Sequence, residues 1–155
     1  SGKTLCYLLP IVDFLMNHSI VSNLKCLIVA PSKDLCVQIT DVLRHLTAGT
    51  SIRYATIYGA NDKGFGNEHD ILRNESADIV VTTPVRLVDH LNLAQRNQLN
   101  FLSHLRFFVV DEADKVVQDE KFKMLVRRVL HLRTSVPQLA VDSATTNAAD
   151  GDENS

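Results

Sequence analysis

The chain has 155 residues, 45% of them hydrophobic and 22% charged, which suits one globular domain with a core and is too short for two ordinary domains. The formal net charge is -2, but the last nine residues carry three acids and no base, so residues 1–146 have a formal charge of +1. This balance argues against a broad basic surface but allows a local phosphate-binding groove, and the sequence shows neither an apolar run of membrane-spanning length nor a signal peptide.

In the N-terminal half, helical and extended patterns alternate. Apolar residues from Leu5 to Leu15 lie near helical spacing, although Pro10 interrupts the pattern and predicts a kink. The stretch "LKCLIVA" is short and apolar and stops at Pro31, as a buried strand does. We predict helices over residues 4–16 and 34–46, strands over 24–30 and 52–58, and a Gly- and Asn-rich loop over 59–70.

The C-terminal half continues this alternation. "PVRLVDHLN" predicts a helix that opens on Pro84, with Thr83 placed as its N-cap. We predict helices over residues 68–74, 84–92 and 122–132, strands over 78–83, 105–110 and 138–144, and a disordered acidic tail over 147–155.

Each predicted strand is an apolar block rather than an in–out alternation, which indicates that both faces of the sheet are covered. The sequence therefore predicts a three-layer α/β/α domain over residues 1–146 with a mainly parallel sheet. Ligands of such sheets bind beyond the carboxyl ends of the strands. Five polar clusters follow predicted strands and so should share this edge: "PSKD", "YGAND", "TTPVR", "DEAD" and "DSAT".

The three cysteines, Cys6, Cys26 and Cys36, are widely spaced and odd in number. They form neither a metal-ligand pattern nor a disulfide framework, which favours a reducing, intracellular compartment. We predict that all three are small buried hydrophobic residues.

The opening "SGKT" has the residues of a phosphate-binding loop that runs into a helix. In such a loop Gly lets backbone N–H groups surround the phosphates, Lys adds a charge and a Ser or Thr hydroxyl binds Mg²⁺. Lys3 and Thr4 are candidates for the last two roles. The full pattern needs a Gly five residues before Gly2, so the tetrapeptide alone is also compatible with the start of an ordinary core helix.

The "DEAD" sequence begins with Asp111, which directly follows the apolar strand "LRFFVV". A carboxylate at a strand end is well placed to hold Mg²⁺ on the β- and γ-phosphates of a nucleotide, usually through water. The alternative is a helix N-terminus, whose dipole favours acidic residues. The presence of "GKT" in the same chain favours the metal-binding interpretation over the helix N-terminus.

Taken together, these motifs resemble those of DEAD-box ATP-dependent RNA helicases, and the chain is similar to their first RecA-like, ATP-binding domain. "SGKT" matches the end of motif I, "DEAD" motif II and "SAT" motif III; "PSKDL", "YGA" and "TPVR" lie where the family has P-T-R-E-L, a Gly-Gly doublet and T-P-G-R. All six come in family order. The stretches "DIVVTTPVRLVDHL" and "LSHLRFFVVDEAD" most resemble helicases that assemble the large ribosomal subunit, which implies a nuclear, nucleolar or cytoplasmic protein.

The resemblance implies ATP and Mg²⁺ as cofactors and assigns roles to single residues. Ser1, Gly2, Lys3 and Thr4 would hold the ATP phosphates, and Thr4 and Asp111 would hold Mg²⁺. Glu112 would orient and deprotonate the attacking water, so that Glu112 and Asp111 are the catalytic pair. Asp114, Ser143 and Thr145 would couple the nucleotide state to RNA and to the second domain.

For RNA, the resemblance implies a path along the backbone with little sequence preference, because phosphate contacts read no bases. Backbone amides at helix starts and nearby cations suit this role. Taken separately, Lys33 and Arg86 could equally be ordinary solvated surface charges. Their place on the shared edge favours contact with RNA. The residues assigned to the RNA path are Pro31, Ser32, Lys33, Gly59, Thr83, Pro84 and Arg86.

Several positions depart from the family pattern. Lys33 stands where the family has Arg, which loses bidentate phosphate binding. Ala60 stands in place of the second Gly, and Val85 puts a β-branched side chain where the family has Gly in T-P-G-R. Smaller departures are Ser32 for Thr, Asp34 for Glu and Asp142 before "SAT". The RNA-side motifs are thus looser than the ATP-side motifs.

The resemblance also implies that part of the motor lies outside this chain, namely the first strand, half of the phosphate loop and the second RecA-like domain. We therefore expect an RNA-dependent ATPase in the full-length protein and an inactive isolated chain. Two alternatives stay open: a catalytically decayed, RNA-binding or scaffold module, and another P-loop ATPase, which would not explain "TPVR" and "SAT" in order.

Overall fold

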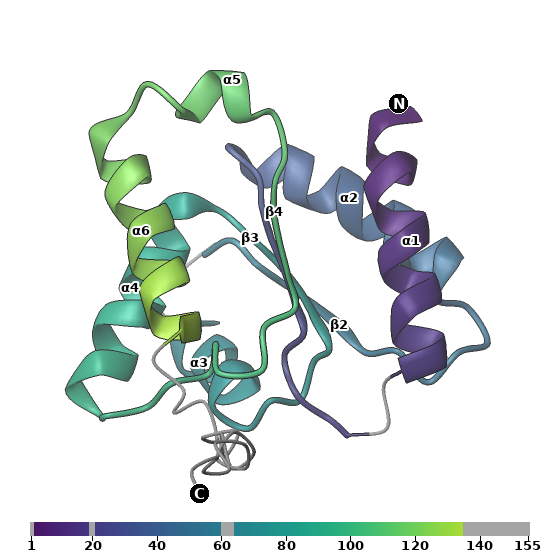
Figure 1. Ribbon diagram of the computed structural model, residues 1–155, viewed down its shortest axis with the longest axis horizontal. Helices are drawn as coiled ribbons and strands as arrows, with labels where there is room; N and C mark the ends of the chain where they lie inside the picture. The colour runs from purple at the N-terminus through teal and green to yellow at the C-terminus, as the bar shows by residue number, and fades with distance from the viewer. Residues whose placement is uncertain (1, 19–20, 60–63, 135–155) are drawn as a thin grey trace, which may run out of the picture.

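The computed structural model describes residues 2–18, 21–59 and 64–134. Within these residues helices and strands alternate as the sequence predicts (Figure 1). The elements are α1 (Gly2–His18), β1 (Cys26–Val29), α2 (Lys33–Leu46), β2 (Tyr54–Ile57), α3 (Phe65–Arg73), β3 (Ile79–Thr82), α4 (Pro84–Arg96), β4 (Phe107–Val110), α5 (Ala113–Val116) and α6 (Glu120–Thr134).

The four described strands form one parallel sheet in the order β2-β3-β1-β4. The register is even: Ile79 of β3 pairs with both Cys26 of β1 and Tyr54 of β2, and Cys26 also pairs with Phe107 of β4. All four strands therefore end at the same edge, which confirms the predicted parallel arrangement.

The sheet is the middle of three layers. Figure 1 shows α1 and α2 on one face and α3, α4 and α6 on the other. Alternate side chains of β1 enter the two cores: Leu27 and Val29 join the cluster with Leu87 and Phe101, whereas Cys26 and Ile28 join the other cluster. The predicted three-layer α/β/α fold is confirmed.

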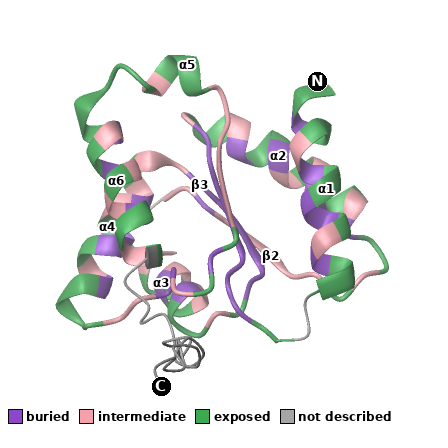
Figure 2. Ribbon diagram, in the orientation of Figure 1, coloured by how far each residue is buried: buried purple, intermediate pink, exposed green. Residues whose placement is uncertain are grey.

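Burial differs between the central and flanking strands, as Figure 2 shows. Every residue of β1 and β3 is buried, whereas the residues of β4 and most of β2 are partly buried. The prediction that both faces are covered thus holds fully for the two central strands. Continuous apolar blocks are the expected sequence for such strands, because neither face meets water.

Helix α3 begins three residues earlier than the predicted range 68–74. The two glycines around Phe65 predict a loop, since each costs a helix roughly 1 kcal/mol relative to Ala. In the structure the Phe65 ring stacks on His90 of α4, with ring centroids 4.3 Å apart and planes 2° apart. This tertiary contact outweighs the local preference of the glycines.

Other differences from the predicted elements are small. Helix α1 continues through Pro10, which is exposed, so water can bond the carbonyl that lacks a helical donor. Helix α5 is a single turn that periodicity does not reveal. Cys6 is exposed, so its predicted burial is wrong, whereas Cys26 and Cys36 are buried.

The predicted strand 138–144 and the tail 147–155 lie outside the described residues, as do Ser1, Ala60 and Asp142. None of the helices in the described part of the chain is long and apolar enough to cross a membrane.

Candidate functional site

The polar clusters that follow the strands meet at the carboxyl edge of the sheet. From the strand order, the segments beginning at Tyr58, Thr83, Ala30 and Asp111 succeed one another across this edge. Helix α1 begins on the same side of the molecule as α5, as Figure 1 shows. The edge thus brings together residues from motifs spread over more than a hundred positions of sequence.

Asp111 makes three hydrogen bonds, two with distant parts of the chain and one with the next residue. Its backbone N–H donates to Val29 O at 2.9 Å and continues the sheet pairing by one residue. The Tyr7 hydroxyl donates to Asp111 Oδ2 at 2.8 Å, and the Glu112 N–H donates to Asp111 Oδ1 at 2.8 Å. Both carboxylate oxygens are therefore fixed in direction.

Tyr7 links Asp111 to Thr4 at the start of α1. Burial raises the pKa of Tyr7 above its usual range, the hydrogen bond and charge of Asp111 raise it further, and a hydrogen bond with Thr4 lowers it. The phenol therefore stays protonated and able to donate at neutral pH. Thr4 itself is buried, and Tyr7 contacts both residues predicted to hold Mg²⁺, Thr4 and Asp111.

These donors fit a magnesium ion. Mg²⁺ prefers oxygen ligands, takes one or two from protein and keeps several waters or phosphate oxygens. Thr4 and Asp111 offer one hydroxyl and one carboxylate, and in the described ranges no three His, Cys, Asp or Glu residues converge into a closed metal cage. The arrangement suits a metal shared with a phosphate ligand.

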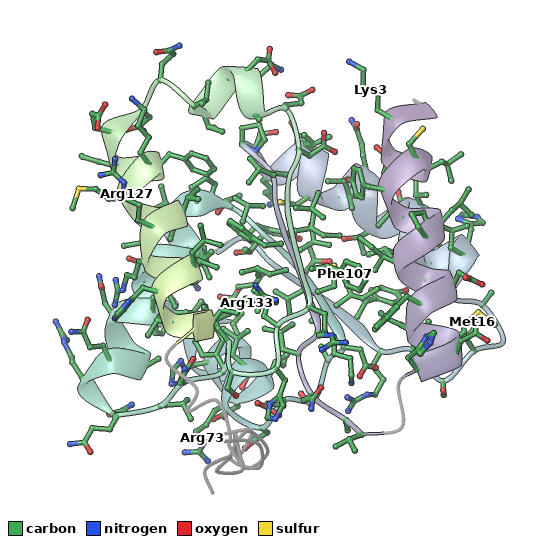
Figure 3. The ribbon with its side chains drawn as sticks, in the orientation of Figure 1. Lys3, Met16, Arg73, Phe107, Arg127 and Arg133 are labelled. Carbon is green, nitrogen blue, oxygen red and sulfur yellow. The ribbon has the colours of Figure 1, made fainter. Side chains whose placement is uncertain are left out.

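Gly2 and Lys3 occupy the exposed first turn of α1. Figure 3 shows the Lys3 side chain extending beyond the end of the helix. First-turn N–H groups of a helix have no intrahelical partner and attract anions together with the helix dipole. The first turn of α1 is thus open for phosphate, while Ser1 lies outside the described residues.

Glu112 has a left-handed backbone conformation, with φ 49° and ψ 46°, which is uncommon for a residue other than glycine. It is the N-cap residue of α5, and its side chain, 38% exposed, pairs with Lys115 Nζ at 2.5 Å. This hydrogen bond raises the pKa of Lys115. Strained residues of this kind occur often at active sites. Asp114 is exposed on α5, and Ser143 and Thr145 lie outside the described residues.

On the RNA side, α2 opens beside the ends of β1 and β2. Ser32 is the N-cap, and its Oγ accepts from Leu35 N at 3.3 Å. Lys33 is exposed, with its Nζ 4.9 Å from the centroid of the Tyr58 ring. A cation over an aromatic face keeps its direction while staying accessible to an anion. Pro31 is partly buried just before this turn.

Helix α4 begins as predicted, with Pro84 at its first turn and Thr83 as N-cap residue. The Thr83 side chain makes no capping hydrogen bond; its carbonyl accepts from Leu87 N at 3.0 Å. Val85 is 74% exposed, so its branched side chain points into solvent. Valine in place of the family's glycine therefore leaves the start of α4 intact, but it adds side-chain volume at the surface in front of the helix.

Arg86 is predicted to face RNA, but the structure places its guanidinium inward, against Glu68 of α3. Arg86 Nε donates to Glu68 Oε2 at 2.6 Å, and Gly59 N donates to Glu68 Oε1 at 3.4 Å. The motifs assign no role to Glu68, which lies where the predicted loop 59–70 and the predicted helix 68–74 overlap. The helical spacing of Phe65, His69 and Leu72 is the signal that could have extended the predicted helix back to Phe65.

The chain is similar to known proteins in both sequence and structure. The DEAD/DEAH box helicase family model matches residues 1–152. The chain is 39% identical over 134 residues to ATP-dependent RNA helicase DBP6 of Saccharomyces cerevisiae, covering 86% of this chain and 20% of that protein. It is 39% identical over 124 residues to ATP-dependent RNA helicase DDX51 of Danio rerio, covering 76% of this chain and 18% of that protein.

Two solved structures show the same fold. DEAD-box helicase Mss116 bound to ssRNA and UDP-BeF superposes with a TM-score of 0.70 at 26% identity, covering 85% of this chain and 26% of that chain. The yeast DEAD-box splicing factor Prp28 gives a TM-score of 0.67 at 28% identity, covering 86% of this chain and 30% of that chain. The chain spans about a fifth of the length of the curated relatives.

Proposed function

Because the chain belongs to the DEAD/DEAH box helicase family, we propose that it is the RecA-like, ATP-binding part of an ATP-dependent RNA helicase. The observation that best supports the proposal is the contact of Tyr7 with both Thr4 and Asp111. It places a hydroxyl from the first turn of α1 and a carboxylate from the end of β4 beside the same tyrosine. A metal–triphosphate group needs oxygen donors from two such elements.

In the proposed reaction, Ser1, Gly2, Lys3 and Thr4 bind the ATP phosphates at the start of α1. Thr4 and Asp111 hold Mg²⁺, which, when bound, neutralises charge that develops on the phosphate oxygens. Glu112 then orients the attacking water and takes its proton. In the structure Glu112 has a left-handed backbone and its side chain pairs with Lys115.

RNA is proposed to cross the edge over the ends of β2, β3 and β1. The starts of α2 and α4 present free backbone N–H groups there, and Lys33 adds an accessible charge. The phosphate-binding set is Pro31, Ser32, Lys33, Gly59, Thr83 and Pro84. Asp114, Ser143 and Thr145 are proposed to couple this surface to the nucleotide and to a second RecA-like domain.

We also propose that the protein acts in assembly of the large ribosomal subunit, in the nucleus or nucleolus. The support is sequence likeness: the stretches around "TTPVRLVDHL" and "VVDEAD" resemble helicases of that process, and the relatives DBP6 and DDX51 share 39% identity with this chain. Crosslinking in cells would identify the RNA that the protein binds, and the identity of that RNA tests the proposal.

The competing function is a non-catalytic RNA-binding or scaffold module. The departures at Lys33 and Val85 favour it, because they loosen the RNA side of the edge. The intact set of Lys3, Thr4 and Asp111 opposes it, because a module that binds no nucleotide has no use for these residues together.

The deciding experiment measures phosphate release by the longest native form of the protein, with and without single-stranded RNA. We expect RNA to stimulate turnover and Glu112→Gln to lower it at least about 100-fold, as loss of a general base does. The matched control is Glu120→Gln, which removes the same charge at an exposed position of α6. Turnover that ignores RNA contradicts a helicase motor, and no turnover at all favours the non-catalytic module.

A further inference from the structure

We propose that Glu68 is a positioning residue of the RNA-binding edge, and that Arg86 acts through Glu68 rather than as a phosphate ligand. The inference rests on the proposed RNA-binding function, and it concerns how the loop at Gly59 is held against the start of α4. Three observations carry it: the hydrogen bonds of Glu68, the burial of the Arg86 guanidinium, and the close approach of Gly59 to that guanidinium.

Glu68 uses both carboxylate oxygens on two different RNA-side segments. Oε2 accepts from Arg86 Nε at 2.6 Å, and Oε1 accepts from Gly59 N at 3.4 Å. The side chains of Arg86 and Glu68 are only 12% and 16% exposed. A shielded ion pair is screened less by salt than a surface pair, so it fixes geometry over a wide range of ionic strength.

The Arg86 guanidinium also packs against an aromatic ring of α3. Its Cζ lies 4.6 Å from the centroid of the Phe65 ring, and Phe65 in turn stacks on His90. His90 Nε2 lies 3.1 Å from Glu68 Oε2, so the carboxylate joins α3 to two residues of α4. Arg86 Nη2 is buried and has no hydrogen-bond partner among the described residues. A phosphate on the surface cannot reach this nitrogen without opening the cluster.

Gly59 packs directly on the same guanidinium. It has φ +65°, and a Cβ built on it would lie 2.8 Å from Arg86 Nε and 2.9 Å from Arg86 Cζ. Any side chain at this position would therefore displace Arg86. The glycine is needed both for its backbone conformation and for its contact with the arginine.

Salt dependence separates a positioning residue from a phosphate ligand. Each phosphate contact with single-stranded nucleic acid contributes about 0.7 to the slope of log affinity against log salt. Loss of a ligand lowers both affinity and slope, whereas loss of a positioning residue lowers affinity alone. Lys33, which is exposed, is the expected ligand for comparison.

The experiment measures binding of a short fluorescent oligouridylate to the longest native form over a series of salt concentrations. We expect Glu68→Gln and Arg86→Gln each to weaken binding about tenfold, in proportion to one lost charge-assisted hydrogen bond, with the slope unchanged. Their double variant should be no weaker than either single variant, because the two residues act as one unit. Lys33→Ala should lower the slope by about 0.7.

Asp70→Asn is the matched control, because Asp70 is an exposed acid on the same helix; it should bind like the parent protein. If a single variant does not fold, the double variant, which removes both charges of the pair, is measured in its place with the same expectation. A slope lowered by Arg86→Gln, or unchanged affinity in folded Glu68→Gln, overturns the inference. Failure of the proposed function is distinguishable: the parent protein would not bind the RNA, or Lys33→Ala would change nothing.

Discussion

At the level of single residues, the Tyr7 hydroxyl joins two residues of the proposed nucleotide site. It lies one helical turn after Thr4, and it donates to an oxygen of Asp111, which is 104 positions away in sequence. The motifs around it name Thr4 and Asp111 but not the tyrosine. Hydrogen bonds to a metal ligand from outside the coordination sphere orient the ligand and commonly contribute about tenfold or more to metal affinity.

We therefore expect Tyr7→Phe to weaken binding of a non-hydrolysable ATP analogue with Mn²⁺ about tenfold, and to leave metal-free nucleotide binding almost unchanged. Calorimetric titration with and without the metal measures the two affinities. Tyr54→Phe is the control. It also removes a tyrosine hydroxyl, but from β2, which lies at the opposite end of the sheet from β4. Equal affinities for Mn²⁺–nucleotide in Tyr7→Phe and the parent protein would show that Asp111 needs no such support.

At the level of elements, the packing of α3 on α4 depends on a buried histidine. His90 is completely buried, stacks on Phe65 and lies within hydrogen-bond distance of Glu68. Burial lowers the pKa of His90, while the hydrogen bond and charge of Glu68 oppose this shift and Arg86 and His69 add to it. The neutral ring is therefore the form that packs between the helices.

Stability should consequently fall in acid. A histidine with a lowered pKa in the folded state keeps its full contribution above the unfolded pKa of about 6.5, and loses it as the pH falls toward the folded value. One such proton gives at most about 1.4 kcal/mol per pH unit in the free energy of unfolding. Urea unfolding at pH values above and below the unfolded pKa measures this change.

His90→Phe keeps a ring on Phe65 and removes the titrating group, so its unfolding free energy should depend less on pH. His45→Gln, at an exposed position of α2, is the control and should keep the dependence of the parent protein. Identical pH dependence in His90→Phe and the parent protein would assign the effect to other groups.

The elements also show where prediction from sequence succeeds and where it stops. Strands β1 and β3 are recognisable because burial on both faces demands an unbroken apolar block. Helix α3 is predicted too short, because the stacking of Phe65 on His90 comes from residues 25 positions apart. The same limit applies to the site: motifs identify Thr4, Asp111 and Gly59, but Tyr7 and Glu68 gain their roles only through contacts that folding creates.

At the level of the whole molecule, the strand order divides the edge of the sheet into two regions. The ends of β2, β3 and β1 carry the proposed RNA set, and the end of β4 with the start of α1 carries the proposed nucleotide set. The two regions meet between β1 and β4, where Asp111 N donates to Val29 O. The two proposed sets are therefore joined through one continuous sheet.

By family resemblance, ATP is hydrolysed between two RecA-like domains, and this chain spans about a fifth of its curated relatives. We expect the 155 residues alone to release phosphate at a negligible rate, even with RNA and Mg²⁺. A malachite-green phosphate assay on the purified chain tests this, with the longest native form as the positive control. Steady turnover by the chain alone that Glu112→Gln abolishes would contradict the expectation.

The three cysteines differ in exposure, so one of them is a specific site for chemical labelling. Burial raises the pKa of Cys36 to about 11 and raises that of Cys26 further, so both thiols stay protonated and shielded at neutral pH. Cys6 is exposed one turn beyond Lys3. A maleimide dye should therefore label Cys6 selectively, close to the proposed nucleotide site, and its fluorescence would test ATP binding without any engineered mutation.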